Sequence, residues 1–172
     1  MTEKKQQVEI KIKKIDPNLP DFEKLEIGDW IDLRITGIKK AFYPNMMTRE
    51  YDFKGDIKGG KIKLKKDFVY FFSLGFACEI PKGYEAYILP RGSTYKNSGL
   101  ILLNNMGIVD ESYCGNDDQW MAVCKADFST EIENNSRLFQ FRIQEKMPKI
   151  KFKYVKDLKN KNRDGFGSTG VK

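Results

Sequence analysis

The feature that most limits the fold of this chain is a two-residue alternation of apolar and charged side chains in short segments. "VEIKIKKI" (residues 8–15) and "KIKLKKDF" (residues 61–68) alternate over most of their length. In an extended strand, successive side chains point to opposite faces, so each segment presents one apolar and one basic face. No long stretch has the 3.6-residue periodicity of an amphipathic helix. The pattern predicts an all-β domain.

Turn residues separate further strand candidates along the chain. "FACEIPKGYEAYIL" (residues 76–89) predicts a hairpin with its turn at residues 81–83, where a proline and a glycine lie close together. The other candidates are "GLILL" (residues 99–103), "QWMAVCKA" (residues 119–126) and "RLFQFRI" (residues 137–143).

The length and the local composition predict one domain with two appendages. A chain of 172 residues buries roughly 70% of its unfolded surface, which suits a single domain. We expect this domain over residues 1–155. Residues 41–66 combine aromatic residues, a proline and three glycines, and are predicted to form a hairpin or long loop inserted into the sheet. Residues 156–172 are rich in Gly, Asn and Lys and are predicted to form a flexible C-terminal arm.

The sequence does not favour a membrane protein. The apolar run "FVYFFSLGFA" (residues 68–77) is about half the length needed to cross a bilayer. Residues 1–14 are charged and lack the apolar core of a secretory signal. We therefore expect a cytoplasmic protein.

The residue types exclude several kinds of chemistry. The chain has three cysteines at unrelated spacings and no histidine. A structural zinc site is therefore not expected, and Ser-His-Asp or Cys-His nucleophilic schemes are excluded. If the protein is an enzyme, its base must be a carboxylate, a lysine or a tyrosine.

The chain is basic, with a formal net charge of +7 from 31 Lys and Arg against 24 Asp and Glu. Lysines gather in residues 4–14, 58–66 and 149–161. Such stretches bind nucleic acid in some proteins, and in others they attract anionic ligands. Because these lysines alternate with apolar residues, the favoured interpretation is solvated strand faces, and nucleic acid is not the expected partner.

Two glycine-containing segments have the residue types that bind phosphate. In "RDGFGSTG" (residues 163–170), glycines allow successive backbone N–H groups to converge, and Arg163 adds a positive charge. In "LPRGSTYKNSG" (residues 89–99), Arg91 and Ser93 share a turn. A disordered linker and a turn held by hydroxyl hydrogen bonds are the respective alternatives.

A carboxylate near the N-terminus is a candidate for indirect metal binding. Asp32 lies in "IGDWIDLRITG" (residues 27–37), where strand alternation places it on one face with Trp30 and Arg34. A carboxylate beside phosphate-binding groups can help to hold Mg²⁺, directly or through water. The alternative is a surface Asp–Arg pair, worth less than about 1 kcal/mol.

A second carboxylate is a candidate general base. In "NNMGIVDESYCG" (residues 104–115), Asp110 follows two β-branched residues at a predicted strand end. We expect these neighbours to shield it partly while leaving room for a water molecule, which is the setting of a general base. The alternative is a hairpin aspartate bonded to the local backbone.

Taken in order, five segments resemble the five motifs of the trimeric dUTPases. The wording of "GDWIDLR", "YEAYILPRGSTYKN", "NDDQW" and "FRIQEKMP" is similar to the phage and prophage dUTPases of Gram-positive bacteria. If the protein is phage-encoded, the expected compartment is the cytoplasm of the bacterial host. The motifs are motif one (residues 28–34), motif two (residues 90–93), motif three (residues 104–115), motif four (residues 136–143) and motif five (residues 165–170).

The resemblance implies hydrolysis of dUTP to dUMP and pyrophosphate. Asp110 would activate the water that attacks the α-phosphorus, and Tyr113 would pack on the deoxyribose and reject UTP. Asp32 would contact Mg²⁺ through water while the triphosphate chelates the metal. The remaining implied substrate-binding residues are Arg91, Gly92, Ser93 and Gln140 for the phosphates, Asn104, Gly107, Ile108 and Val109 for uracil, and Arg163, Phe166, Gly167, Ser168 and Thr169 in the arm.

The fold implied by the resemblance is a distorted jelly-roll β-barrel that assembles as a homotrimer. In this family each site takes motif three from one chain, motifs one, two and four from another, and motif five from the third. The implied monomer is therefore inactive, and the arm reaches a neighbouring subunit.

The sequence departs from the family at several places, one of which is that Arg163 lies closer to Phe166 than in many relatives. Gly92 stands where the family usually has a serine, and Ser93 is the available substitute. Cys114 stands where a basic residue is common, and its role has no account. Residues 41–66 are longer than a minimal dUTPase needs, so we hypothesise that they offer a surface to another protein and that their deletion spares dUTP hydrolysis.

Two rival functions remain for comparison. The homologous dCTP deaminases have a catalytic Glu on the strand after motif three, and residues 116–126 contain no Glu. Deamination is therefore not favoured. The other rival is a non-catalytic regulator that binds a protein or a nucleic acid, which would leave the motif residues without a role.

Overall fold

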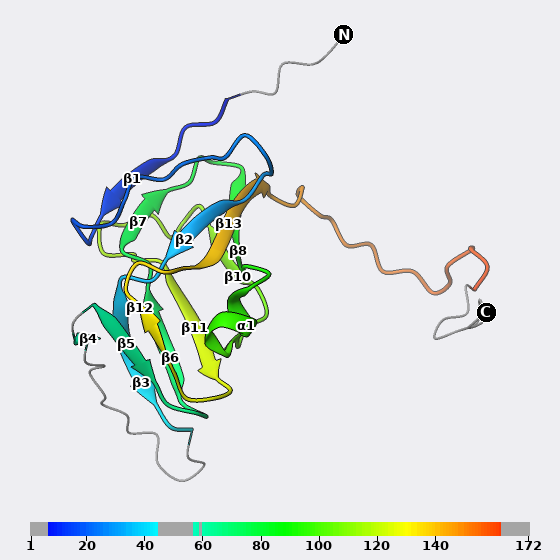
Figure 1. The fold of residues 1–172 in the computed structure, drawn as a ribbon. Helices are drawn as coiled ribbons and strands as arrows, with labels where there is room; N and C mark the ends of the chain where they lie inside the picture. The colour runs from blue at the N-terminus through cyan, green and yellow to red at the C-terminus, as the bar shows by residue number, and fades with distance from the viewer. Residues whose placement is uncertain (1–6, 45–56, 59, 163–172) are drawn as a thin grey trace.

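The computed structural model describes residues 7–44, 57–58 and 60–162, and these form thirteen strands and one short helix (Figure 1). The all-β prediction is confirmed. The bounds are β1 Lys11–Lys14, β2 Ile31–Arg34, β3 Gly37–Phe42, β4 Ile57–Lys58, β5 Lys61–Leu64, β6 Val69–Ser73, β7 Phe76–Glu79, β8 Tyr84–Pro90, α1 Thr94–Ser98, β9 Leu100–Leu102, β10 Gly107–Asp110, β11 Met121–Ala126, β12 Thr130–Glu133 and β13 Arg137–Glu145.

Two four-stranded antiparallel sheets supply most of the core. Their strand orders are β10-β8-β13-β2 and β3-β6-β11-β9. Every second residue of β8 is buried, at Ala86 and Ile88, and the corresponding alternation in β11 buries Ala122 and Cys124. Side chains from both sheets belong to one hydrophobic cluster. The opposite face of the first sheet therefore remains available for polar residues.

An aromatic contact fixes the first sheet against the rest of the core. Trp120, which directly precedes β11, is 1% exposed, and its ring lies 5.4 Å from that of Phe141 on β13 in an edge-to-face arrangement. The ring of Phe76 on β7 lies 5.0 Å from Trp120. The edge-to-face pair of Trp120 and Phe141 adds to the stabilisation from burial.

The predicted hairpin over residues 76–89 is wrong. A turn does form, because the backbone N–H of Tyr84 bonds to the carbonyl of Pro81 and Gly83 has a φ of 88°. However, β7 pairs with β1, and β8 pairs with β10 and β13, so the two strands enter different sheets. The turn residues predict where the chain reverses its direction, but they do not determine which strands pair with each other.

The C-terminal part of the predicted 41–66 insertion belongs to the sheets. β5 pairs with β4 and β12, and Ile62 and Leu64 lie in the core. Alternation in "KIKLKKDF" is thus confirmed for this strand. Residues 45–56 and 59 lie outside the described residues, and the role of the insertion as a partner surface stays a prediction.

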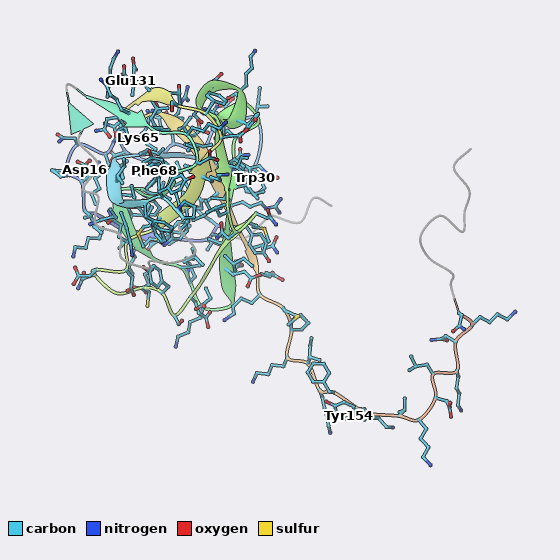
Figure 2. All side chains as sticks on the ribbon, turned by 90° about the horizontal axis from the view of Figure 1, so that it is seen from below. Asp16, Trp30, Lys65, Phe68, Glu131 and Tyr154 are labelled. Atoms are coloured by element: carbon cyan, nitrogen blue, oxygen red, sulfur yellow. The ribbon has the colours of Figure 1, made fainter. Side chains whose placement is uncertain are left out.

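After β13 the chain leaves the body of the protein as an extended arm (Figure 1). Figure 2 shows Tyr154 on this arm, at a distance from the sheets. Its apolar side chains are open to solvent, with Phe152 76%, Tyr154 94% and Leu158 83% exposed. The arm therefore begins before the boundary predicted at residue 155.

The described residues contain no helix that is long and apolar enough to cross a membrane.

The burial of the three cysteines predicts a simple pattern of thiol reactivity. Cys114 is exposed, whereas Cys78 and Cys124 are buried. Burial, with a smaller contribution from Cys114, raises the pKa of the Cys78 thiol to about 12, and burial also raises the pKa of Cys124. Since the thiolate is the reactive form, we expect one thiol per native chain to react rapidly with an aromatic disulfide reagent. The absorbance of the thiolate that the reagent releases, recorded before and after denaturation, measures the number of reactive thiols. A rapid phase that remains in Cys114→Ser would contradict the prediction.

Candidate active site

The outer face of the β10-β8-β13-β2 sheet and the turn that follows β8 carry most of the predicted residues of motifs one, two, three and four. On β13, Phe139 and Phe141 point into the core, so Gln140 between them points outward. Asp32 on β2 is the register partner of Gln140, and Leu89 on β8 is its partner on the other side. The structure thus places Asp32 and Gln140 side by side, next to the end of β8.

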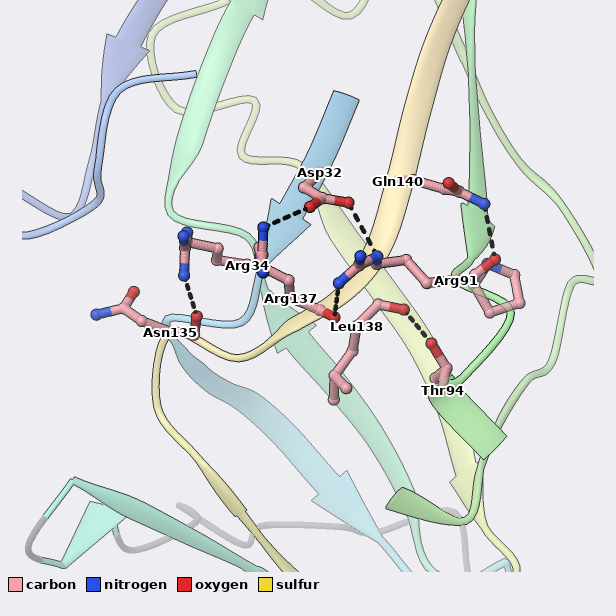
Figure 3. Close-up of polar contacts among 9 residues, drawn as sticks. Asp32, Arg34, Arg91, Thr94, Asn135, Arg137, Leu138 and Gln140 are labelled. Atoms are coloured by element: carbon pink, nitrogen blue, oxygen red, sulfur yellow. Dashed lines mark hydrogen bonds and ion pairs between the residues drawn. The ribbon is translucent and has the colours of Figure 1, made fainter. Parts of the chain in front are cut away.

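At this end of the face, one carboxylate holds two arginines (Figure 3). Oδ1 of Asp32 lies 2.9 Å from Nε of Arg91, and Oδ2 lies 3.2 Å from Nη1 of Arg137. The Asp32 side chain is 23% exposed, which makes these contacts less solvated than a typical surface ion pair. The group has a net positive charge, because two guanidinium groups share one carboxylate. A guanidinium group has five N–H donors, so donors remain for phosphate oxygens.

The turn after β8 is fastened to β13, which orients Arg91. The backbone N–H of Arg91 donates to the carbonyl of Leu138 at 3.0 Å, and its Nη1 donates to the carbonyl of Arg137 at 3.1 Å. The hydroxyl of Thr94, a buried residue, also donates to the carbonyl of Leu138 (Figure 3).

Gln140 is held by the same turn. Its side-chain Nε2 donates to the carbonyl of Pro90 at 3.2 Å, directly before Arg91. The amide group is therefore oriented toward the arginine end of the face by a backbone carbonyl.

Gly92 and Ser93 lie exposed at the start of α1. In the described part of the chain, no atom lies within 4 Å of a Cβ built at Gly92, so the missing motif-two serine leaves open space. Ser93 is the N-cap residue of α1, and its hydroxyl makes no capping hydrogen bond within the described structure. The Ser93 hydroxyl is thus free of a structural role in that cap.

Motif three occupies the other edge of the same sheet. β10 pairs with β8, with Gly107 opposite Ile88 and Asp110 opposite Glu85. Ile108 is 61% exposed on the outer face. Asn104 precedes the strand in an exposed turn, and Val109 packs against the core.

Asp110 is exposed, so the shielding by its β-branched neighbours that we predicted from the sequence is wrong for the single chain. The reason is strand alternation: Val109 points inward, and Asp110 points outward. Its Oδ1 accepts the backbone N–H of Ser112 at 2.7 Å. The Ser112 hydroxyl first, then this N–H and the Lys146 charge, hold the pKa of the Asp110 carboxyl below its usual value. Asp110 is therefore ionised at neutral pH.

Tyr113 is held close to Asp110 by two hydrogen bonds. Its backbone N–H donates to the Asp110 carbonyl at 3.1 Å, and its hydroxyl donates to the Gln119 carbonyl at 3.2 Å. The residue is 38% exposed, so part of it remains accessible to a ligand. Cys114 follows it and lines a hollow together with Cys78.

The two halves of the predicted site lie at opposite ends of the sheet face. Asp110 is opposite Glu85, and Arg91 comes six residues after Glu85 (91 − 85 = 6). At about 3.3 Å per residue, the two ends are separated by roughly 20 Å. One chain therefore does not bring Asp110 to the Arg91–Asp32 group.

The motif-five residues of the prediction lie outside the described residues. They are Arg163, Phe166, Gly167, Ser168 and Thr169.

Sequence reasoning did not single out four residues that contact the predicted ones. Arg137 was quoted only within motif four, although it begins β13 beside Asp32. Glu111 and Ser112 follow Asp110 directly, and their side chains act on the turn. Lys146 could not be found from sequence, because its approach to the turn depends on the pairing of β13 with β8.

The donors of this chain suit a metal ion that is already bound to phosphates. Among the described residues there is no group of three or more Asp, Glu, Cys or His side chains that could hold a metal ion. Both oxygens of Asp32 are engaged by arginines. Among the described residues, Asp32 is the carboxylate beside these arginines and is therefore the side chain here that could contact a hydrated divalent cation.

Comparisons with known proteins agree with this geometry. A sequence model described as dUTPase matches residues 60–170 of the chain. The chain is 40% identical over 165 residues to the SPbeta prophage-derived deoxyuridine 5'-triphosphate nucleotidohydrolase YosS of Bacillus subtilis (strain 168), and the match covers 96% of this chain and 100% of that protein.

Solved structures with the same fold include two phage proteins. The dUTPase of Staphylococcus bacteriophage 80alpha with dUPNHPP matches with a TM-score of 0.68 at 16% identity, covering 95% of this chain and 99% of that one. A mutant dUTPase from phage phi11 of S. aureus, described with a structural Mg(II) ion, matches with a TM-score of 0.64 at 12% identity, covering 88% and 99%. The predicted jelly-roll fold is confirmed by these matches.

The hydrogen bonds at Asp110 predict how its pKa responds to substitution. Ser112→Ala removes the hydroxyl and should raise the pKa of Asp110 toward its usual value, because the carboxylate loses a donor that favours the charged form. The side-chain carboxyl signals of carbon-13-labelled aspartate, followed by NMR during acid titration, measure this, with Asp110→Asn giving the assignment. Ser129→Ala, in the loop directly before β12, is the control; an equal pKa in Ser112→Ala and the wild type would show that the hydroxyl has no effect.

Proposed function

The chain belongs to the dUTPase family, and on that premise we propose that it hydrolyses dUTP to dUMP and pyrophosphate in a homotrimer whose active sites lie between subunits. The observation that carries the proposal is the separation of the two half-sites. The base candidate and the phosphate-binding group lie at opposite ends of one exposed sheet face, so a complete site needs two copies of the chain. Identity of 40% over the whole length of the Bacillus relative supports the substrate.

The Arg91–Asp32–Arg137 group suits a triphosphate. Two guanidinium groups offer planar, paired donors to phosphate oxygens, which a lysine does not. Asp32 keeps the two positive groups close together before the ligand arrives. Gln140, fixed by the Pro90 carbonyl, adds a neutral donor beside them. This end of the face binds and orients the triphosphate.

Asp110 acts as the general base. The lowered pKa keeps its carboxylate ionised, so it can accept a proton from a water molecule within hydrogen-bond reach. The water oxygen attacks the α-phosphorus, the bond to the bridging oxygen breaks, and pyrophosphate leaves. A carboxylate with a low pKa is a weak base, so the rate depends on how well the water and the phosphorus are aligned.

The turn around Asp110 suits recognition of the nucleoside. Tyr113 is anchored through its hydroxyl to the Gln119 carbonyl, so the ring is available for contact with the sugar. Gly107 lies so close to β8 that a Cβ there would meet Cβ of Ile88 at 3.1 Å. The β10 backbone, with Asn104, Ile108 and Val109, reads uracil mainly through main-chain groups and leaves little room for a methyl group.

A head-to-tail arrangement brings the two ends together. When the Asp110 end of one copy faces the Arg91 end of the next, the contact is heterologous, and a closed ring of such contacts makes a cyclic trimer. The arm beyond β13 carries exposed apolar side chains at Phe152, Tyr154 and Leu158. These side chains need a partner surface, and the arm would carry motif five to a neighbouring subunit.

Mg²⁺, when bound to the triphosphate, neutralises part of its negative charge. Asp32 is the residue of this chain that would contact the hydrated metal through water. Its carboxylate is already shared by Arg91 and Arg137.

One prediction of the proposed function concerns the substrate. In the presence of Mg²⁺ the wild type should release pyrophosphate from dUTP, with far slower release from dCTP, dTTP and UTP. Asp110→Asn should lower kcat for dUTP by about a thousandfold or more, because it removes the proton acceptor. Coupled pyrophosphate detection and chromatography of the product measure this. Equal turnover of UTP or dTTP would refute the proposed nucleoside recognition, and full activity of Asp110→Asn, with the trimer retained, would remove the proposed base.

A further prediction tests whether each active site is shared between two subunits. Asp110→Asn and Arg91→Ala chains should each be inactive alone. When the two are co-expressed with different tags, mixed trimers should recover about a third of the wild-type activity, because in a head-to-tail ring that contains both chains one contact of the three pairs an intact Asp110 with an intact Arg91. Activity of tandem-purified mixed trimers measures this, and light scattering checks the assembly. Mixed trimers as inactive as their parents would place both residues in a site within one chain.

A further inference from the structure

Three separate segments meet beside Asp110, at the end of the sheet away from the arginines. The Glu111 carboxylate accepts the backbone N–H of Gly83, in the turn before β8, and lies 3.3 Å from Nζ of Lys146, which follows β13. The backbone N–H of Lys146 donates to the carbonyl of Gly83 at 2.8 Å. Glu111, Gly83 and Lys146 thus form a closed set of three contacts, which we call the Glu111 latch.

The two charged side chains of the latch are partly shielded from solvent. The side chains of Glu111 and Lys146 are 30% and 36% exposed. The Gly83 N–H first, and then the Lys146 ammonium group, hold the pKa of the Glu111 carboxyl below its usual value. Gly83 has a φ of 88°, a conformation that glycine adopts without strain, so the turn can present its N–H to Glu111. Two of the three contacts use the backbone of the turn.

The position of the latch determines what it can control. Glu111 is the residue after Asp110, and the turn it belongs to is closed by the Ser112 N–H on the Asp110 carboxylate and by the Tyr113 N–H on the Asp110 carbonyl. Fixing Glu111 to the ends of β8 and β13 therefore fixes the backbone from which the Asp110 side chain projects.

We propose that Glu111 and Lys146 are positioning residues for Asp110, and that they hold the catalytic turn against the sheet at the point where the C-terminal arm departs. The inference rests on the proposed role of Asp110 as the general base. Lys146 has two functions in this arrangement. It holds Glu111, and it is the first residue after β13. The same residue therefore fixes the catalytic turn and the start of the arm.

The charges around Asp110 define a second readout. Lys146 faces it from the end of β13, Glu85 faces it across the β8 register, and Glu111 adjoins it, with Lys82 acting on Glu111 from the turn. Lys146 is the cation that lowers the pKa of Asp110, after the Ser112 hydrogen bonds. Removal of its charge should raise the pKa of Asp110, and the acid limb of the kcat profile should move to higher pH.

The test compares Lys146→Met, Glu111→Ala, the double variant and Lys146→Arg in the full-length protein with dUTP. Each single loss should lower kcat about tenfold with little change in KM, because a loosened base loses alignment while the phosphate end stays intact. The double variant should be no slower than the singles, since the two residues act as one unit. Lys146→Arg should restore most of kcat and return the acid limb to its wild-type pH.

Lys61→Met is the matched control. It removes another half-exposed ion pair, in which Nζ of Lys61 lies 2.9 Å from Glu131 in a different sheet. This variant should leave kcat and its pH profile unchanged. If Lys146→Met and Glu111→Ala lower only the melting temperature and leave kcat and the acid limb unchanged, the latch is merely structural and the proposal is overturned.

Failure of the latch and failure of the proposed function give different results. A wild type that releases no pyrophosphate from dUTP overturns the function. The latch is tested independently of substrate by hydrogen exchange of the Gly83 and Ser112 amides. Both should exchange faster in Glu111→Ala than in the wild type and in Lys61→Met, and unchanged exchange would overturn the latch even in an inactive protein.

Discussion

The pairing of β8 along both its edges is the constraint on which the site depends. Its register with β10 fixes Asp110 opposite Glu85, and its register with β13 fixes Gln140 beside Leu89. A strand side chain cannot change face without a one-residue slip, and such a slip would move Ala86 and Ile88 out of the core. Hydrophobic burial on the inner face therefore sets the spacing of the polar groups on the outer face.

The two ends of this face follow different electrostatic designs. At the arginine end, Asp32 occupies donors of Arg91 and Arg137 until an anion competes for them. At the other end, Asp110 accepts hydrogen bonds from its own turn and remains exposed. The arginine end holds two positive groups in a fixed arrangement, and the Asp110 end keeps a carboxylate ionised. Chemistry that needs both groups requires the two ends of different chains to meet.

The sequence could predict what depends on local pattern, and less of what depends on pairing. Alternation identified β5, and the motif order located Asp32, Arg91, Asp110 and Gln140 on the right kind of fold. The sequence alone could not exclude a hairpin of β7 and β8, because a proline and a glycine produce the same turn whether the two flanking strands pair with each other or enter different sheets. It also missed Lys146, since its contact with Glu111 is made across 35 residues (146 − 111 = 35) by a register that no local pattern contains.

The exposure of Asp110 gives a physical reason for assembly. A general base is most effective where competing water is excluded, yet in the single chain Asp110 faces solvent with Ile108 61% and Tyr113 38% exposed around it. Covering these side chains with a neighbour's surface buries apolar area and dries the carboxylate in the same step. In the proposed trimer, the contact that stabilises the assembly would thus be the contact that completes the site, and a dissociated chain would lack both the neighbour's arginines and the shielding of Asp110.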